Sequence, residues 1–405
     1  MEVLSVGLKD VLRVRDELTA KEKQFILQKI RDQVLSHYPS PDKALVDVES
    51  EKNRLQSQIR GQVIEVLNTD FPNISLEVVE DLTRYIFDHL FGLGIIESLL
   101  RKPEITDIMI QGTRIVVVRQ GEKEELPETF SEEDDVKRII DRITSPAGKK
   151  VDVANPCCDC DLYDGSRCHI IIPPISDKIY ITIRKLGCMD LELTDWVEQG
   201  VFTVKEAAII KNAVKEKRNI LISGGTGAGK TTLLNSLTKL IHPDQMVVTL
   251  EDTYELKLSQ KHVKRLLTRE GALDGRGKVT FRMLLKNALR MNPDRLIMGE
   301  VRDESAYDLL HALNIGHKGS LSTIHANSVL DALWRLETLA LSGAPRMPLL
   351  AIRRQIARVI DVTIQLKGLE LESGYIKNRE VLEIAHLKSS LSKENDYVME
   401  TLSTR

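Results

Sequence analysis

A glycine-rich stretch near the middle of the chain ends in a lysine and two threonines. Gly224, four further residues, Gly229, Lys230 and Thr231 match the phosphate-loop pattern in full. Glycines let backbone N–H groups turn towards an anion without obstruction by side chains. Lys230 is placed to reach the β- and γ-phosphates of a nucleotide, and the Thr231 hydroxyl is placed to hold Mg²⁺. We therefore expect ATP and Mg²⁺ as ligands. The expected nucleotide-binding residues are Gly225, Thr226, Gly227, Ala228, Gly229, Lys230, Thr231 and Thr232.

The elements on either side of this stretch suit the same chemistry. The apolar run Ile220–Ile222 predicts a buried strand, and residues 232–237 have helical spacing. A helix that begins directly after the loop directs its positive end at the same phosphates. A glycine-rich surface turn is the alternative interpretation, and the strand before it and the helix after it disfavour that alternative.

Three later apolar runs also predict strands, namely Met246–Leu250, Arg295–Met298 and Ser320–Ile324. Their repetition, with helical sequence between at least some of them, predicts a largely parallel sheet covered by helices. Ligands bind such sheets beyond the carboxyl ends of the strands. The polar residues that follow these strands are Glu251, Asp252, Glu300 and His325.

These residue types suit the removal of a terminal phosphate. Acidic groups hold Mg²⁺ and orient the attacking water, and cations neutralise charge that develops on the phosphoryl group. Gly299 occupies the place of the usual metal-binding aspartate, so we expect Glu300 to act through a Mg²⁺-bound water or as the water-orienting base. For His325, a hydrogen-bonded core histidine is the alternative. The expected catalytic residues are Glu300, Glu251, Lys230 and His325, and the expected metal site comprises Thr231, Asp252 and Glu300.

The composition limits the class of protein. The 405 residues suffice for two or three domains, and the net charge of −3 provides no strong basic field for nucleic acid, which we do not expect as a partner. The first residues lack the pattern of a signal peptide. No run approaches the ~20 apolar residues of a membrane span. We expect a cytoplasmic protein that reaches a membrane only through a partner.

Four of the five cysteines lie close together in the sequence, at positions 157, 158, 160 and 168. The alternation of Cys158, Cys160 and Leu162 predicts a strand in which cysteines serve as small apolar residues. A zinc site that includes His169 is the alternative, although the cluster contains no C-x-x-C pair.

The part of the chain before the loop predicts two kinds of structure. Helical periodicity covers residues 21–37, a segment from about 45 to 67, and 75–90, and from Glu104 the period shortens towards that of strands. We therefore expect a helical N-terminal module at 1–75, a mixed α/β domain at 76–190 and a nucleotide domain at 191–405.

Four ordered motifs resemble those of the type II/type IV secretion ATPases. They are the phosphate loop, Leu250–Leu256, Met298–Arg302 and Gly316–Ser328. The likeness extends upstream to Phe91 and includes Asp164–Arg167 and Ile183–Lys185. Within the family, the sequence is most similar to the tight-adherence (Tad, CpaF-like) pilus assembly branch.

The resemblance implies a RecA-like P-loop NTPase core, preceded by a mixed α/β (PAS-like) domain and a small helical module. It implies a homohexameric ATPase that powers pilus assembly or type II secretion-like protein transport through an inner-membrane platform protein. A conjugative or other nucleic-acid-translocating ring is the alternative, and a scaffold that binds ATP without hydrolysing it is a third possibility. The resemblance also implies that Arg167 and Arg184 approach the nucleotide. Further candidates for phosphate or cross-subunit contacts are Arg265, Arg269, Arg290 and Arg302.

Overall fold

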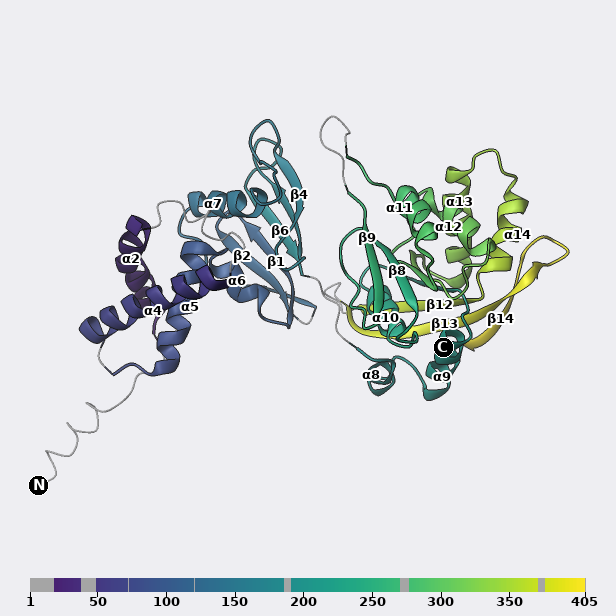
Figure 1. Cartoon of the computed structure of the whole chain (residues 1–405), viewed down its shortest axis with the longest axis horizontal. Coiled ribbons are helices and arrows are strands. Elements are labelled where there is room, and N and C mark those ends of the chain that lie inside the picture. Colours follow the sequence, from purple (N-terminus) through teal and green to yellow (C-terminus); the bar gives the residue numbers. More distant parts are fainter. Residues whose placement is uncertain are drawn as a thin grey trace, which may run out of the picture. The chain divides into compact units, whose positions relative to one another are not determined.

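The computed structural model of the chain divides into two compact units, Met1–Lys185 and Leu186–Arg405 (Figure 1). It describes residues 18–37, 49–71, 73–119, 121–185, 191–269, 277–370 and 376–404. Over these ranges we find no helix with the length and apolar character that crossing a bilayer requires.

The first unit opens with the helices α2 (Ala20–His37), α4 (Glu49–Asp70) and α5 (Leu76–Phe91). Their apolar stripes pack into one cluster that fully buries Ile30, Ile59 and Leu82. Ser75 caps α5 by accepting a hydrogen bond from the Val78 N–H. The helical periodicity therefore predicted α2 and α5 closely. The expected start of the second helix, near residue 45, lies outside the described residues.

A six-stranded antiparallel sheet follows, in the order β3-β2-β1-β6-β5-β4. Its strands are β1 (Ile105–Gln111), β2 (Arg114–Arg119), β3 (Glu122–Glu125), β4 (Cys157–Asp161), β5 (Arg167–Ile171) and β6 (Tyr180–Arg184). The helix α6 (Ile95–Leu100) precedes the sheet in the chain, and α7 (Glu133–Thr144) lies between β3 and β4 in the sequence. Cys160 on β4 lies directly opposite Cys168 on β5, and both are free cysteines buried in the apolar core of this unit. Within the described ranges, no group of three or more His, Cys, Asp or Glu side chains is arranged to hold a metal ion.

The second unit is built on an eight-stranded sheet in the order β14-β13-β12-β7-β11-β10-β8-β9. Its strands are β7 (Ile220–Gly224), β8 (Met246–Glu251), β9 (His262–Leu267), β10 (Arg295–Met298), β11 (Leu321–His325), β12 (Val362–Glu370), β13 (Ile376–Leu391) and β14 (Tyr397–Thr404). The pairs from β12 to β9 are all parallel, whereas β13 and β14 are antiparallel additions. The four strands expected from the sequence lie side by side, so their carboxyl ends meet at one edge.

Helices cover both faces of this sheet (Figure 1). They are α8 (Leu193–Glu198), α9 (Val204–Lys215), α10 (Lys230–Thr238), α11 (Phe281–Ala288), the 3₁₀ helix η1 (Leu289–Met291), α12 (Ser305–Asn314), α13 (Val329–Gly343) and α14 (Leu349–Val359). Alternate strand residues enter different cores: Ile220 and Ile222 pack with α8–α10, and Leu221 packs with α11–α14. The two cores hold the sheet edge rigid.

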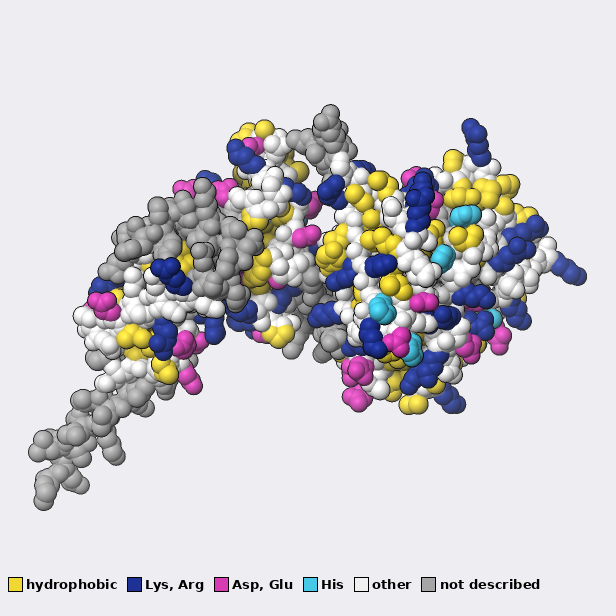
Figure 2. All heavy atoms as spheres, viewed as in Figure 1, with side chains coloured by type: hydrophobic (Ala, Val, Ile, Leu, Met, Phe, Trp, Pro, Cys, Tyr) yellow, Lys and Arg dark blue, Asp and Glu magenta, His cyan; other side chains and the backbone are white. Residues whose placement is uncertain are grey.

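The surface of the second unit carries both signs of charge. On the face shown in Figure 2, Lys and Arg side chains are dispersed among acidic and hydrophobic ones and do not form one stripe. Several of these charges are paired at the surface, for example Lys261 with Asp244 and Arg282 with Asp308, at 2.6 Å in each pair. Such exposed pairs contribute little to stability.

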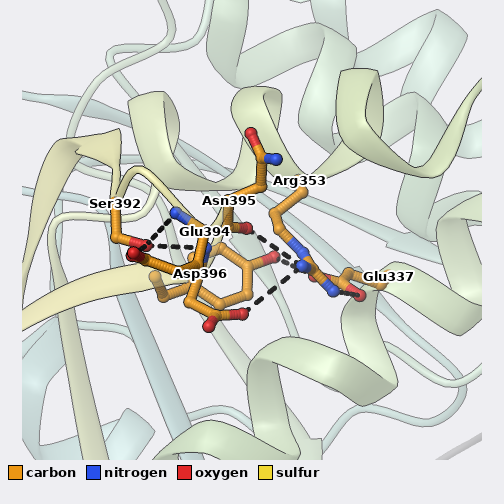
Figure 3. Close-up of polar contacts among 7 residues, drawn as sticks. Glu337, Arg353, Ser392, Glu394, Asn395 and Asp396 are labelled. Atoms are coloured by element: carbon orange, nitrogen blue, oxygen red, sulfur yellow. Dashed lines mark hydrogen bonds and ion pairs between the residues drawn. The ribbon is translucent and has the colours of Figure 1, made fainter.

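A buried ion pair attaches the β13–β14 hairpin to the helices (Figure 3). Arg353 of α14 donates to both carboxylate oxygens of Glu337 of α13, at 2.7 and 3.2 Å. The Tyr397 hydroxyl of β14 donates to the same carboxylate at 2.6 Å, and Arg353 also donates to the Asn395 carbonyl at 2.9 Å. Glu337 is only 5% exposed, so its charge depends on these partners.

We predict that Arg353→Ala lowers the free energy of unfolding of the second unit by about 3 to 5 kcal/mol, because it leaves the buried Glu337 carboxylate unpaired. Tyr397→Phe removes one hydrogen bond to that charge and should cost about 1.5 to 3 kcal/mol. Both tryptophans, Trp196 and Trp334, lie in this unit, so their fluorescence during urea denaturation measures the change. The matched control is the exposed neighbour, Arg354→Ala; equal stabilities of the two alanine variants would contradict the prediction.

Candidate functional site

The phosphate-loop residues form a tight turn between β7 and α10. Gly229 has a φ of +91°, a backbone conformation that L side chains rarely adopt. A Cβ atom on Gly224 would lie 2.6 Å from the carbonyl oxygen of Leu366 in β12. Glycine is therefore required at position 229 by conformation and at position 224 by the neighbouring strand.

Lys230 begins α10 and folds back over the loop. Its Nζ donates to the carbonyl oxygens of Gly224 and Gly225, at 3.0 and 2.8 Å, and lies 3.3 Å from Nδ1 of His325. Burial lowers the pKa of Lys230 to about 8; the charge of Arg335 acts in the same direction, and that of Glu300 opposes it. The loop thus holds a cation in a poorly hydrated position, where an anion would stabilise it.

Glu300 and His325 reach this cation from the next two strands of the sheet. Glu300 follows β10, His325 ends β11, and the Glu300 carboxylate lies 3.7 Å from Nε2 of His325. Burial lowers the pKa of His325, and the charges of Lys230 and Arg335 lower it further, so the ring is neutral at neutral pH. The structure therefore brings Lys230, Glu300 and His325 together.

Glu251 lies beside this group, but protein groups already use its carboxylate. One oxygen accepts hydrogen bonds from the N–H groups of Glu255 and Leu256, at 2.8 and 2.9 Å. The other accepts from the Thr249 hydroxyl at 2.8 Å and pairs with Arg265 at 3.4 Å. With only 2% exposure, Glu251 orders the turn that follows β8.

The predicted metal ligands differ in how well their surroundings suit Mg²⁺, which prefers oxygen ligands. Thr231 lies in the first turn of α10, and Glu300 has a partly exposed carboxylate. Asp252 accepts a hydrogen bond from the Thr268 hydroxyl at 2.7 Å and forms an ion pair with Arg302. Thr231 and Glu300 thus carry oxygen atoms of the kind that Mg²⁺ binds, whereas the Asp252 carboxylate already contacts Thr268 and Arg302.

The two arginines expected to approach the nucleotide belong to the first unit. Arg167 on β5 lies directly opposite Arg184 on β6, and the register places Asp161 and Asp107 on the outer sides of this pair. Arg184 contacts Asp107 at 3.0 Å and remains 69% exposed. The opposing guanidinium groups of Arg167 and Arg184 repel each other, and the flanking Asp161 and Asp107 carboxylates offset this repulsion.

The other four candidate arginines fall into two groups. Arg265 and Arg302 pair with the acidic residues after β8, and Arg265 also lies over the ring of Tyr254 at 4.2 Å. Arg269 donates to the Gly277 carbonyl, and Arg290 is exposed in η1. The first group therefore orders the acidic turn.

Sequence reasoning missed Arg335. This residue of α13 is close enough to Lys230 and His325 for its charge to lower the pKa of both. It also lines a pocket of about 440 Å³ together with His325, Asn327 and Asp331. The available signal was the helix that begins directly after His325, in which Asp331 and Arg335 are spaced to share one face.

We predict that MgADP binding weakens above about pH 8. Phosphate oxygens stabilise the charged form of Lys230, so binding raises its pKa from the value of about 8 in the free protein. Affinity is then full below about pH 8 and falls as the pH rises towards the pKa of the bound form. Isothermal titration calorimetry in buffers of different ionisation enthalpy detects this change as proton uptake on binding.

The matched control for this titration is Lys230→Arg, because a guanidinium stays charged over the same pH range. This variant should bind MgADP without proton uptake. Proton release by the wild type, or an affinity that rises with pH in this range, would show that the Lys230 ammonium does not receive the phosphates.

Comparisons with known proteins identify the family of the chain. Residues 90–368 match the family model described as "Type II/IV secretion system protein". A putative conjugal transfer protein of Mycobacterium tuberculosis is 34% identical over 299 residues, which cover 72% of this chain and 84% of the relative. The conjugal transfer protein TrbB of Rhizobium radiobacter is 37% identical over 227 residues, which cover 55% of this chain and 65% of the relative. The solved structure of the pilus retraction motor PilT with bound ADP shares the fold, with a TM-score of 0.54 at 20% identity over 72% of this chain and 82% of that chain.

Proposed function

Because the chain belongs to the type II/IV secretion system protein family and is an ATP hydrolase, we propose that it is a motor that couples ATP hydrolysis to protein secretion or pilus assembly. The observation that carries this proposal is the convergence of Lys230, Glu300 and His325 at the ends of three neighbouring parallel strands. Such an edge is where ligands bind sheets of this kind. Nucleotide binding belongs to the family, and the motor role rests on the residues that surround the loop.

In the proposed mechanism, Lys230 binds the β- and γ-phosphates, and the backbone from Gly225 to Thr232 holds the phosphate chain. Thr231 and Glu300 would hold Mg²⁺, which when bound would neutralise charge on the phosphates. Glu300 also orients the attacking water, and neutral His325 donates a hydrogen bond to the γ-phosphate. Glu251 positions the acidic turn, and Asp252 would be a further Mg²⁺ ligand if its ion pair with Arg302 opened.

The proposed architecture is a RecA-like P-loop core (191–405), preceded in the chain by a helical module (1–75) and a PAS-like α/β domain (76–190). Six copies form a ring. Arg167 and Arg184 approach the nucleotide and couple its loss to domain movement. The register of β5 and β6 supports this role, since it places Arg167 directly opposite Arg184, and arginine is well suited to binding phosphate.

The proposed pathway is the tight-adherence (Tad, CpaF-like) branch of type IV pilus assembly. The motor acts in the cytoplasm, at the periphery of the inner membrane, against an integral platform protein. The upstream motifs carry this finer assignment, namely Phe91–Glu97, Asp164–Arg167 and Ile183–Lys185.

Conjugative transfer is the second candidate, and one observation favours it: the M. tuberculosis and R. radiobacter relatives bear the names of conjugal transfer proteins. The net charge of −3 and the dispersed basic side chains of Figure 2 weigh against direct binding of nucleic acid. DNA binding that weakens with salt, together with ATPase activity stimulated by DNA, would favour the second candidate over pilus assembly.

We predict that Glu300→Gln lowers kcat for ATP hydrolysis by about 10² or more while MgATP still binds, because the amide cannot serve as the base for water. Lys230→Ala should remove nucleotide binding itself. Phosphate release and equilibrium binding measure the two effects separately. The matched control is Glu304→Gln, an exposed carboxylate four residues away; normal turnover of both Glu300→Gln and Lys230→Ala would refute the proposed motor.

A further inference from the structure

The loop has a second side, which the mechanism above does not use. The sheet order places β11 and β10, with His325 and Glu300, on one side of β7, and places β12 and β13 on the other. On that other side, Arg379 of β13 lies opposite Gly368 of β12 and extends to the loop. Its Nε donates to the Gly227 carbonyl oxygen at 3.4 Å.

Arg379 and the loop are packed tightly against each other. A Cβ atom on Gly229 would lie 2.8 Å from Cδ and 3.0 Å from Nε of Arg379, and 3.3 Å from the ring of Trp196. Trp196 is almost fully buried, and its ring N–H donates to the Ser236 hydroxyl at 2.9 Å. The guanidinium is thus held against the glycine backbone that forms the floor of the phosphate site.

Among the residues that the structure describes, little compensates the charge of Arg379. The side chain is partly buried, and burial lowers the pKa of its guanidinium. A guanidinium carries five N–H donors. Across the described residues, the long bond to Gly227 is the one hydrogen bond that it makes, and no carboxylate pairs with it. A desolvated cation with unused donors favours an anionic ligand.

The direction of a bound nucleotide follows from these two sides. The γ-phosphate belongs with Lys230, Glu300 and His325, towards β11. A triphosphate chain that starts there and crosses the loop extends towards β12 and β13 on its other side. The α-phosphate and the adjoining nucleoside therefore come next to Arg379.

We propose that Arg379 binds the α-phosphate end of the nucleotide, on the side of the loop opposite the site of hydrolysis. This assignment rests on the proposed nucleotide chemistry of the loop and adds a residue from the C-terminal hairpin to it. Because ADP and ATP share the α-phosphate, Arg379 contributes equally to the binding of both. Groups on the β11 side, such as Arg335, contribute to ATP more than to ADP.

The experiment measures dissociation constants of MgADP and of Mg²⁺ with the non-hydrolysable β,γ-imido analogue of ATP, by isothermal titration calorimetry on the full chain. Arg379→Ala should weaken both by the same factor, about 10- to 100-fold, the expected effect of losing a hydrogen bond to a charged group. Arg379→Lys should restore part of the loss. Arg335→Ala should weaken the analogue and leave MgADP within about twofold.

The matched control is Arg358→Ala, an exposed arginine of α14, which should bind both nucleotides like the wild type. Trp196 fluorescence in a Trp334→Phe background reports whether the loop floor stays folded in the Arg379 variants. With that signal unchanged, unaltered affinity for MgADP, or a loss confined to the ATP analogue, would overturn the assignment. Failure of the wild type to bind MgADP would instead refute the nucleotide chemistry of the loop itself.

Discussion

The buried ammonium of Lys230 is the charge around which the site is organised. The loop's own carbonyl oxygens hold it, at Gly224 and Gly225, and Arg335 adds a second positive charge nearby. The charge of Glu300 opposes the lowering of the Lys230 pKa, and His325 is neutral. Among the described residues, the Lys230 ammonium contacts carbonyl oxygens and the His325 ring rather than a carboxylate. A phosphate chain supplies negative charge here, which is why the apo site favours an anion.

The parallel sheet makes this arrangement possible. Strands β7, β11, β10 and β8 run in the same direction, so residues far apart in the sequence follow their carboxyl ends at one edge. The C-terminal hairpin is attached at two places: Arg379 lies against the loop, and Arg353 links the turn before β14 to Glu337 on the helix that carries Arg335. The contact of Arg379 with Gly227 joins the hairpin to the loop itself.

Much of this organisation could be predicted from the sequence. Short apolar runs with polar ends predicted the four central strands within one or two residues at each end, because buried parallel strands are apolar on both faces. Ser75 and Thr203 cap α5 and α9, each by accepting a hydrogen bond from a backbone N–H. The strands β9, β12, β13 and β14 were not predicted. Of these, β9 and β14 are the edge strands of the sheet, which need no continuous apolar run. The cysteine strand proved to be one whose buried members, Cys160 and Cys168, pack with aliphatic side chains.

For the site, sequence order was a good guide to position and a poor guide to contacts. It led us to expect Lys230, Glu300 and His325 at neighbouring strand ends, where their side chains lie together. It did not show that backbone amides and Arg265 surround Glu251, or that Arg302 pairs with Asp252. Arg335 and Arg379 were missed because their roles depend on how α13 and β13 pack, which no local pattern encodes. A structure determined with Mg²⁺ and a non-hydrolysable ATP analogue tests the central claim most directly. We expect the γ-phosphate within hydrogen-bonding distance of Lys230 Nζ and the His325 ring; a terminal phosphate bound away from both side chains would contradict it.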